Sequence, residues 1–175
     1  MLDPSLTSLS TPPGTVATVQ PIGVKALYGL ALHRDHLLAV DPFRGYLLQI
    51  DPTTSNTLIL NPRHAHEFQL ATGLACWQDR LWITCDQRVL VTSLEDITPT
   101  LVLTLPYTAD GVAVWENTLY VSCKKAGYIF VYDRDSGQRI TQFSAPGIGV
   151  ENIAVWGDYL WVCDQIEQTI YCLDR

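Results

Sequence analysis

Four acidic side chains and one amide stand at recurring points of the sequence, where they could hold a divalent cation or a polar ligand. Asp110 and Glu151 each precede a short apolar phrase, and Asn152 directly follows Glu151. Asp41 and Asp164 end the apolar segments that follow two such phrases. Because hard cations such as Ca²⁺ prefer carboxylate and amide oxygens, Asp110, Glu151 and Asn152 are candidate metal ligands. The alternative is that each aspartate caps its own loop.

Histidines and cysteines are the other reactive side chains. His64 and His66 would point to one side of an extended segment, as a metal-binding pair does, but a solvated loop insertion is the simpler interpretation. The five cysteines show no metal-binding spacing. Cys76, Cys163 and Cys172 lie inside apolar strand patterns and are expected to be small core residues, with Cys163 and Cys172 as diagonal neighbours on one face. Cys85 and Cys123 end strands, where exposure is expected. We expect five reduced thiols and no cysteine nucleophile, because no histidine recurs beside them.

One phrase, written four times, must position these residues. It reads GLALHRDHLLAVD at 29–41, GLACWQDRLWITC at 73–85, GVAVWENTLYVSC at 111–123 and NIAVWGDYLWVCD at 152–164. Periods near 40 residues with several short strands in each unit are typical of propeller blades. In every phrase two strands flank a turn ending in Asp or Asn, at 35, 79, 117 and 158, and these residue types tolerate left-handed backbone.

The third unit shows most clearly that each unit is an antiparallel meander. GVAVW, TLYVSC, YIFVYD and RITQFSA form four successive strand patterns. The innermost strand is apolar on both faces, as expected for a blade that is covered by a neighbour on each side. The sequence therefore predicts an all-β propeller of four blades, each a four-stranded meander, and repeated aromatic residues that pack between blades.

The expected boundaries leave the ring incomplete. Residues 1–14 are predicted to be flexible, and the propeller is predicted to occupy 15–175, with an outer strand at 15–19 and blades at about 29–62, 73–105, 111–145 and 152–175. The last blade lacks its outer strand in this assignment. Two closures are open: a four-bladed ring, or half of an eight-bladed ring completed by a homodimer or a missing half, with the strand at 15–19 lent across the junction.

The composition of the chain limits the kinds of partner that it is expected to bind. The net charge of −7 disfavours a nucleic-acid partner, whose phosphates would be repelled. Lys124-Lys125, the one basic doublet, is expected to be a solvated turn. The sequence shows neither a secretion signal nor an apolar run that could span a membrane, so we expect a cytoplasmic protein that does not contact membranes.

The phrase LYVSC-KKAG-YIFVYDRDSGQRITQF resembles the NHL/YVTN class of β-propellers. More weakly, GYLLQIDPTTSNTLILNP and PYTADGVAVWENTLYVSCKKAGYIFVYDR resemble the propeller segment before a transglutaminase-like domain in certain bacterial proteins. Propellers of the gluconolactonase/SMP-30 type bind a metal through Glu, two Asn and Asp, and Glu151, Asn152 and Asp110 match part of that set. The Glu-Gly-Pro motif of that family is absent here.

Three functions follow as expectations. The first is a binding or scaffold module that presents Asp41, Asp110, Glu151, Asn152 and Asp164 on the loop face to a protein or small ligand, without a required cofactor. The second is a metal-dependent hydrolase of the lactonase type, which would hold Ca²⁺ or another divalent cation. The third is a propeller fragment of a larger transglutaminase-like protein.

Overall fold

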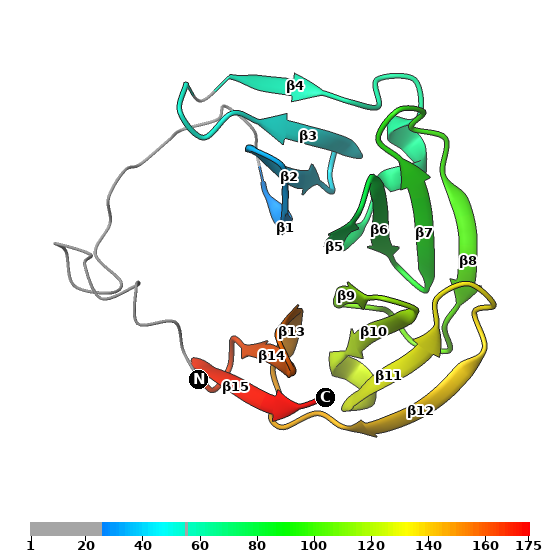
Figure 1. Cartoon of the computed structure of the whole chain (residues 1–175), viewed down its shortest axis with the longest axis vertical. Helices are drawn as coiled ribbons and strands as arrows, with labels where there is room; N and C mark the ends of the chain where they lie inside the picture. The colour runs from blue at the N-terminus through cyan, green and yellow to red at the C-terminus, as the bar shows by residue number, and fades with distance from the viewer. Residues whose placement is uncertain (1–25, 55) are drawn as a thin grey trace, which may run out of the picture.

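A computed structural model describes residues 26–54 and 56–175. The segments expected to be flexible (1–14) and to form an outer strand (15–19) lie outside the described residues. Four separate antiparallel sheets stand around a central axis like the blades of a propeller (Figure 1). The predicted all-β propeller of four blades is therefore confirmed.

Each blade is formed by strands in the order of the chain. Blade 1 comprises β1 (Tyr28–His33), β2 (His36–Asp41), β3 (Tyr46–Ile50) and β4 (Thr57–Ile59). Blade 2 comprises β5 (Ala71–Trp77), β6 (Arg80–Cys85), β7 (Arg88–Ser93) and β8 (Thr100–Thr104). Blade 3 comprises β9 (Gly111–Trp115), β10 (Thr118–Cys123), β11 (Tyr128–Asp133) and β12 (Arg139–Ser144). Blade 4 comprises β13 (Val150–Trp156), β14 (Tyr159–Asp164) and β15 (Thr169–Asp174).

Helical structure in the described residues is limited to two short 3₁₀ turns. They are η2 (Ala65–Phe68), between blades 1 and 2, and η3 (Lys124–Ala126), between β10 and β11. In the part of the chain that the structure describes, no helix is long and apolar enough to cross a bilayer.

The turn between the first two strands of each blade differs in detail from the prediction. Its first residue has the left-handed backbone: Arg34 (φ 53°), Gln78 (57°), Glu116 (51°) and Gly157 (61°). The Asp or Asn that follows is not among the residues with positive φ. The prediction was wrong about which residue adopts this conformation, and three turns place a non-glycine residue where glycine is normally preferred.

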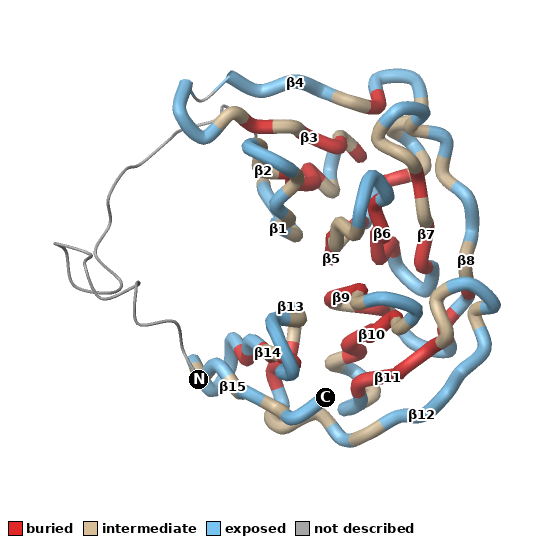
Figure 2. The backbone as a smooth tube through the Cα atoms, viewed as in Figure 1, coloured by how far each residue is buried: buried red, intermediate tan, exposed pale blue. Residues whose placement is uncertain are grey.

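Neighbouring blades pack face to face through their inner strands. Strand β1 lies against β5, β5 against β9, and β9 against β13. Blades 1 and 2 share the apolar cluster that contains Leu38, Val40, Leu74 and Ile83, and the junctions of blades 2 with 3 and 3 with 4 have clusters of the same kind. Most of the core of the molecule is thus divided among three junctions between blades, where Figure 2 shows the buried segments. A fourth, smaller cluster of Ala39, Leu48 and Ile50 lies on the other face of blade 1.

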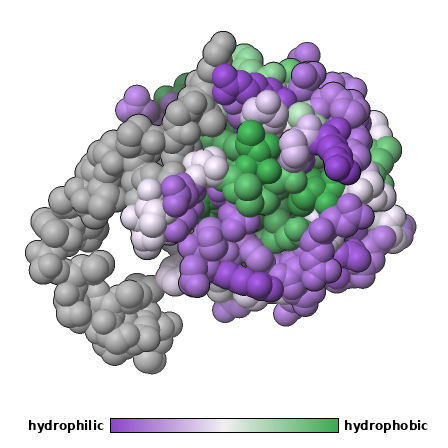
Figure 3. Space-filling model, turned by 90° about the horizontal axis from the view of Figure 1, so that it is seen from above, coloured by the Kyte–Doolittle hydropathy of each residue, from purple (hydrophilic) through white to green (hydrophobic). Residues whose placement is uncertain are grey.

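Blade 1 and blade 4 each keep one face without a described blade against it (Figure 1). The free face of blade 4 is formed by Asn152, Ala154, Trp156, Trp161, Cys163, Ile170 and Cys172. The free face of blade 1 includes Leu30, Leu32, Leu37 and Ala39. Seen from above the view of Figure 1, hydrophobic surface lies amid hydrophilic residues (Figure 3). Leu58 of the outer strand β4 is exposed as well.

Candidate functional site

The loops at one end of the propeller form the surface that we call the loop rim. It consists of the loops before the first strand of blades 2, 3 and 4 and the loops after the second strand of each blade. Backbone hydrogen bonds join the two kinds of loop: Leu70 N–H to Pro42 O, Ala109 N–H to Asp86 O, and Gln165 N–H to Gly149 O. The opposite end, which we call the turn end, carries the tight turns inside each blade.

Lys124 brings two of the predicted site residues together on the loop rim. Its backbone N–H donates to Asp110 Oδ2 at 2.6 Å, and its Nζ lies 2.5 Å from Glu151 Oε1. Ser122 Oγ donates to the backbone carbonyl of Glu151 and so joins blade 3 to blade 4. Burial raises the pKa of Asp110, and the charge of Glu151 adds to this rise, whereas Lys124 opposes it. The hydrogen bond that Lys124 Nζ donates to Glu151 raises the pKa of Lys124.

Asp164 caps the loop after β14. Its carboxylate accepts hydrogen bonds from Gly149 N (2.7 Å), Ile166 N (2.8 Å) and Glu167 N (2.8 Å). Burial acts to raise the pKa of Asp164, but these three N–H donors and Lys124 outweigh it, so the pKa is lowered. The charge of Asp164 also raises the pKa of Lys124. Lys124 thus contacts Asp110 and Glu151 directly, whereas Asp164 acts on it only through its charge.

Asp41 has the same capping role in blade 1. It is fully buried, and its Oδ1 accepts from the backbone N–H groups of Phe43 (3.1 Å) and Arg44 (3.2 Å). Its Oδ2 lies 3.5 Å from Arg44 Nη1 and has no hydrogen-bond partner among the described residues. These contacts tie Asp41 to its own loop rather than to the group around Lys124.

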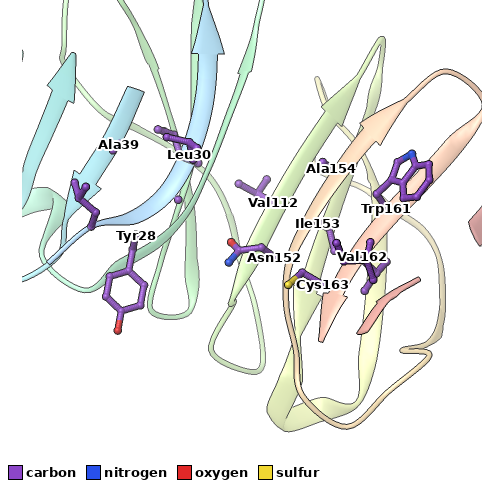
Figure 4. A pocket seen from close by; sticks show the side chains of 14 residues that line it. Tyr28, Leu30, Ala39, Val112, Asn152, Ile153, Ala154, Trp161, Val162 and Cys163 are labelled. Carbon is purple, nitrogen blue, oxygen red and sulfur yellow. The ribbon is translucent and has the colours of Figure 1, made fainter. Parts of the chain in front are cut away.

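Asn152, the fifth predicted residue, lies on β13 and points into a cavity near the axis (Figure 4). The cavity has a volume of about 560 Å³, and its apolar wall includes Tyr28 and Leu30 of blade 1 and Cys163 and Ile170 of blade 4. Its lining therefore comes partly from the free faces of blades 1 and 4.

Asn152 replaces a glycine that the other three blades have at the same position. A Cβ atom on Gly73 would come within 2.8 Å of Gly111 Cα, and one on Gly111 would come within 2.4 Å of Glu151 O. Gly29 is equally close to Leu74. The inner strand of the next blade therefore passes too near for a side chain at three junctions, whereas Asn152 lies on the free face of blade 4, where a side chain has room.

Metal-ligand geometry is absent from the described residues, where no group of three or more His, Cys, Asp or Glu side chains could hold an ion. Beside Asp110 and Glu151, the positive charge is supplied by Lys124. His64 precedes η2, and its Nδ1 lies 3.0 Å from Glu67 Oε1. The segment is thus a 3₁₀ turn rather than the extended pair that would direct both histidines to one side.

The cysteines reverse the exposure expected from the sequence. Cys85 and Cys123 are buried, Cys76 is partly buried, and Cys163 and Cys172 are exposed; all five are free. Burial raises the pKa of Cys123 to about 12 and that of Cys76 to about 11, and it also raises the pKa of Cys85. These three thiols are therefore poor nucleophiles at neutral pH. The predicted diagonal placement of Cys163 and Cys172 agrees with the strand register.

Sequence reasoning missed an apolar component of the loop rim. Five large apolar side chains are exposed in its loops: Phe43, Leu70, Tyr107, Ile148 and Ile166. Phe43 and Leu70 also line a hollow of about 320 Å³ beside Tyr28 and Thr108. A sequence signal for these exposed residues exists: an apolar residue stands next to Pro or Gly between two strand patterns, as in Pro42-Phe43 and Gly147-Ile148.

No protein-family model matches this chain, and no curated protein matches it either. Among solved structures, it is similar to a chain of a nidogen/laminin complex, with a TM-score of 0.72, 10% identity, and coverage of 87% of this chain and 60% of that one. Glutaminyl cyclase from Myxococcus xanthus is similar with a TM-score of 0.66 and 14% identity, over 85% of this chain and 65% of that one. The computationally designed Ika4 protein is similar with a TM-score of 0.63 and 14% identity, over 90% of this chain and 99% of that one.

At such low identity the similarity concerns the fold alone. The chain spans less than two thirds of the nidogen/laminin and glutaminyl cyclase chains, but nearly all of the designed one. The sheet order, the packing of inner strand on inner strand, and these neighbours agree: the chain folds as a β-propeller unit of four blades.

Proposed function

We propose that this chain is a cytoplasmic binding module of the NHL/YVTN type of propeller, which holds a protein partner on its loop rim. The observation that carries the proposal is the set of five exposed apolar side chains in the rim loops. They come from loops of all four blades, and Phe43 is 72% exposed. Exposed apolar residues gathered on one surface are typical of interaction sites.

The turn end of the propeller provides the contrast. Its tight turns between first and second strands carry Arg34-Asp35, Gln78-Asp79, Glu116-Asn117 and Gly157-Asp158, which are polar apart from one glycine. Exposed Trp156 and Tyr159 flank the last of these turns but lie on the free face of blade 4, whereas the apolar side chains of the rim come from loops of all four blades. The loop rim is therefore the better candidate for partner contact.

Charge defines the partner further. The chain has a net charge of −7, and on the rim the carboxylates of Asp110, Glu151 and Asp164 accompany Lys124, while Lys125 and Arg44 are further basic residues of the rim loops. A partner segment with apolar anchors flanked by basic residues fits this surface. Five free cysteines support a reducing compartment as the place of action. No described metal-binding group supports the hydrolase alternative.

A displayed library of random peptides tests the proposal without a known partner. Peptides selected on the full chain should contain aromatic or aliphatic anchors, and binding should weaken at least about tenfold in the double variant Phe43→Ser, Ile166→Ser. The double variant Leu58→Ser, Ile140→Ser is the matched control, because Leu58 and Ile140 are also apolar and exposed but lie outside the rim. Peptides that bind the rim variant as tightly as the wild type would refute the loop rim as the binding surface.

A further inference from the structure

We propose that the free faces of blades 1 and 4 bind a second copy of this chain, so that two copies close one propeller ring. The free face of blade 4 of each copy would pack against the free face of blade 1 of the other. The inference concerns a surface distinct from the loop rim, and it rests on the junctions between blades that the chain already contains.

The junction between blades 3 and 4 shows what each free face is built to do. Blade 3 contributes Ala113, Tyr120, Ile129 and Val131 to this junction, and blade 4 contributes Val150, Ile153, Leu160 and Val162. In the repeat, the first four positions correspond to Ala154, Trp161, Ile170 and Cys172 on the free face of blade 4. The last four correspond to Leu27, Leu30, Leu37 and Ala39 of blade 1. The two free faces are thus the two halves of a fourth junction.

Within one copy several side chains of these two halves are exposed, whereas Ala39 is buried. Leu30 and Leu32 are each 67% exposed, Trp156 is 58% exposed and Ile170 is 68% exposed. The axial cavity of about 560 Å³ lies between blades 1 and 4. No described blade covers either face, and a second copy of the chain can supply the missing half to each.

A second copy satisfies both faces at once, because each copy supplies one half of two identical junctions. The two copies are then related by a two-fold axis along the propeller axis, and their loop rims lie at the same end of the ring. If each free face covers on the order of 500 Å², the two junctions bury on the order of 2,000 Å² in total, which is enough for a stable dimer.

Light scattering of the full chain after size exclusion provides the first test. We expect a particle of about twice the 19.5 kDa of one chain. Leu30→Lys on blade 1 and Ile170→Asp on blade 4 should each yield monomers, since either change damages both junctions. Ile140→Asp, which alters an isoleucine 60% exposed on the outer strand of blade 3, should remain dimeric. Circular dichroism verifies that each variant retains its strands.

Mixing the two monomeric variants tests the head-to-tail arrangement. One junction of the mixed pair has wild-type residues on both sides. The other junction brings together the two introduced side chains, whose charges are opposite, so dimers should reappear. If the dimer instead paired two blade 4 faces, Leu30→Lys alone would remain dimeric, and that result would overturn the proposal.

The native cysteines provide a readout that does not depend on any variant folding. Cys163 and Cys172 are exposed on the free face of blade 4, whereas Cys85 and Cys123 are buried and serve as internal controls. Labelling of the exposed pair should slow at least tenfold as the protein concentration rises through the dimer range. A particle of 19.5 kDa at every concentration, with unchanged labelling, would refute the second copy.

Discussion

Blades 3 and 4 contain nearly the same phrase, but their surroundings differ. In blade 3 both faces are covered, and Ile129, Val131 and Tyr120 are buried against blade 4. The corresponding positions of blade 4 hold Ile170, Cys172 and Trp161, of which the first two are exposed. Figure 2 shows the same contrast between the buried strand β11 and the exposed strand β15. A strand pattern therefore specifies the blade, and the presence of a neighbour decides how much of it is buried.

The largest difference is expected between two equivalent isoleucines. Ile129→Ala should lower the free energy of unfolding by about 2–5 kcal/mol, because it opens a cavity in the junction of blades 3 and 4. Under conditions where the chain is monomeric, Ile170→Ala should change it by less than about 0.5 kcal/mol. Urea titrations of the two variants provide the comparison, and equal losses would show that the two faces are covered alike.

The inner strands offer a second comparison. Gly111→Ala places a methyl group within 2.4 Å of Glu151 O, so blades 3 and 4 must separate, at a cost of about 1–3 kcal/mol. Asn152→Ala on blade 4 should be close to neutral, because its side chain points into the axial cavity. Thermal unfolding of both variants tests this, and a tolerated Gly111→Ala would argue against close approach of the inner strands.

Substitutions in the turns at positions 78 and 157 are expected to change the free energy of unfolding by about 1 kcal/mol in opposite directions. Gln78 has φ 57° without the freedom of glycine, so Gln78→Gly should stabilise the protein. Gly157 has φ 61° and open space around the missing Cβ, so Gly157→Ala should destabilise it through backbone strain alone. Chemical denaturation measures both, and a change of the same sign in the two variants would contradict the assignment.

Two carboxylates should give opposite pH dependences, with the smallest effects. The pKa of Asp110 is raised by burial, so its ionisation costs stability as the pH rises through and above the ordinary aspartate value near 3.9. The pKa of Asp164 is lowered, so its contribution is present above that value and is lost as the pH falls through the lowered pKa.

Asp110→Asn should therefore stabilise the chain at neutral pH, and Asp164→Asn should destabilise it. Both differences from the wild type should shrink toward acidic pH. Stability curves measured from neutral to acidic pH decide the matter, because a gain from Asp164→Asn at neutral pH would be incompatible with a carboxylate that accepts three N–H groups.

Local pattern was sufficient to predict the blades. The repeated phrases, their turn residues and their spacing depend on neighbours in the chain, and strands such as GVAVW and TLYVSC form where they were expected. The same argument placed Cys163 and Cys172 in apolar strands but assigned them to the core. That assignment was wrong because blade 4 has no described neighbour on that face.

The loop rim was less accessible to sequence reasoning. Lys124 was expected in a solvated turn, but its contact with Glu151 spans 27 residues and depends on how blade 4 packs against blade 3. The possibility that Asp41 and Asp164 cap loops was recognised, because such caps are local. Contacts between blades could not be predicted, because local sequence patterns do not say how far one meander lies from the next.

The consecutive order of strands in each described sheet has a consequence for how such a chain folds and grows. Because every strand pairs with the strand before or after it, a blade can form from about 40 contiguous residues without waiting for distant segments. Stability then accumulates as a sum over units and the contacts between adjacent units. Duplication of one unit therefore lengthens the array and leaves every earlier pairing intact.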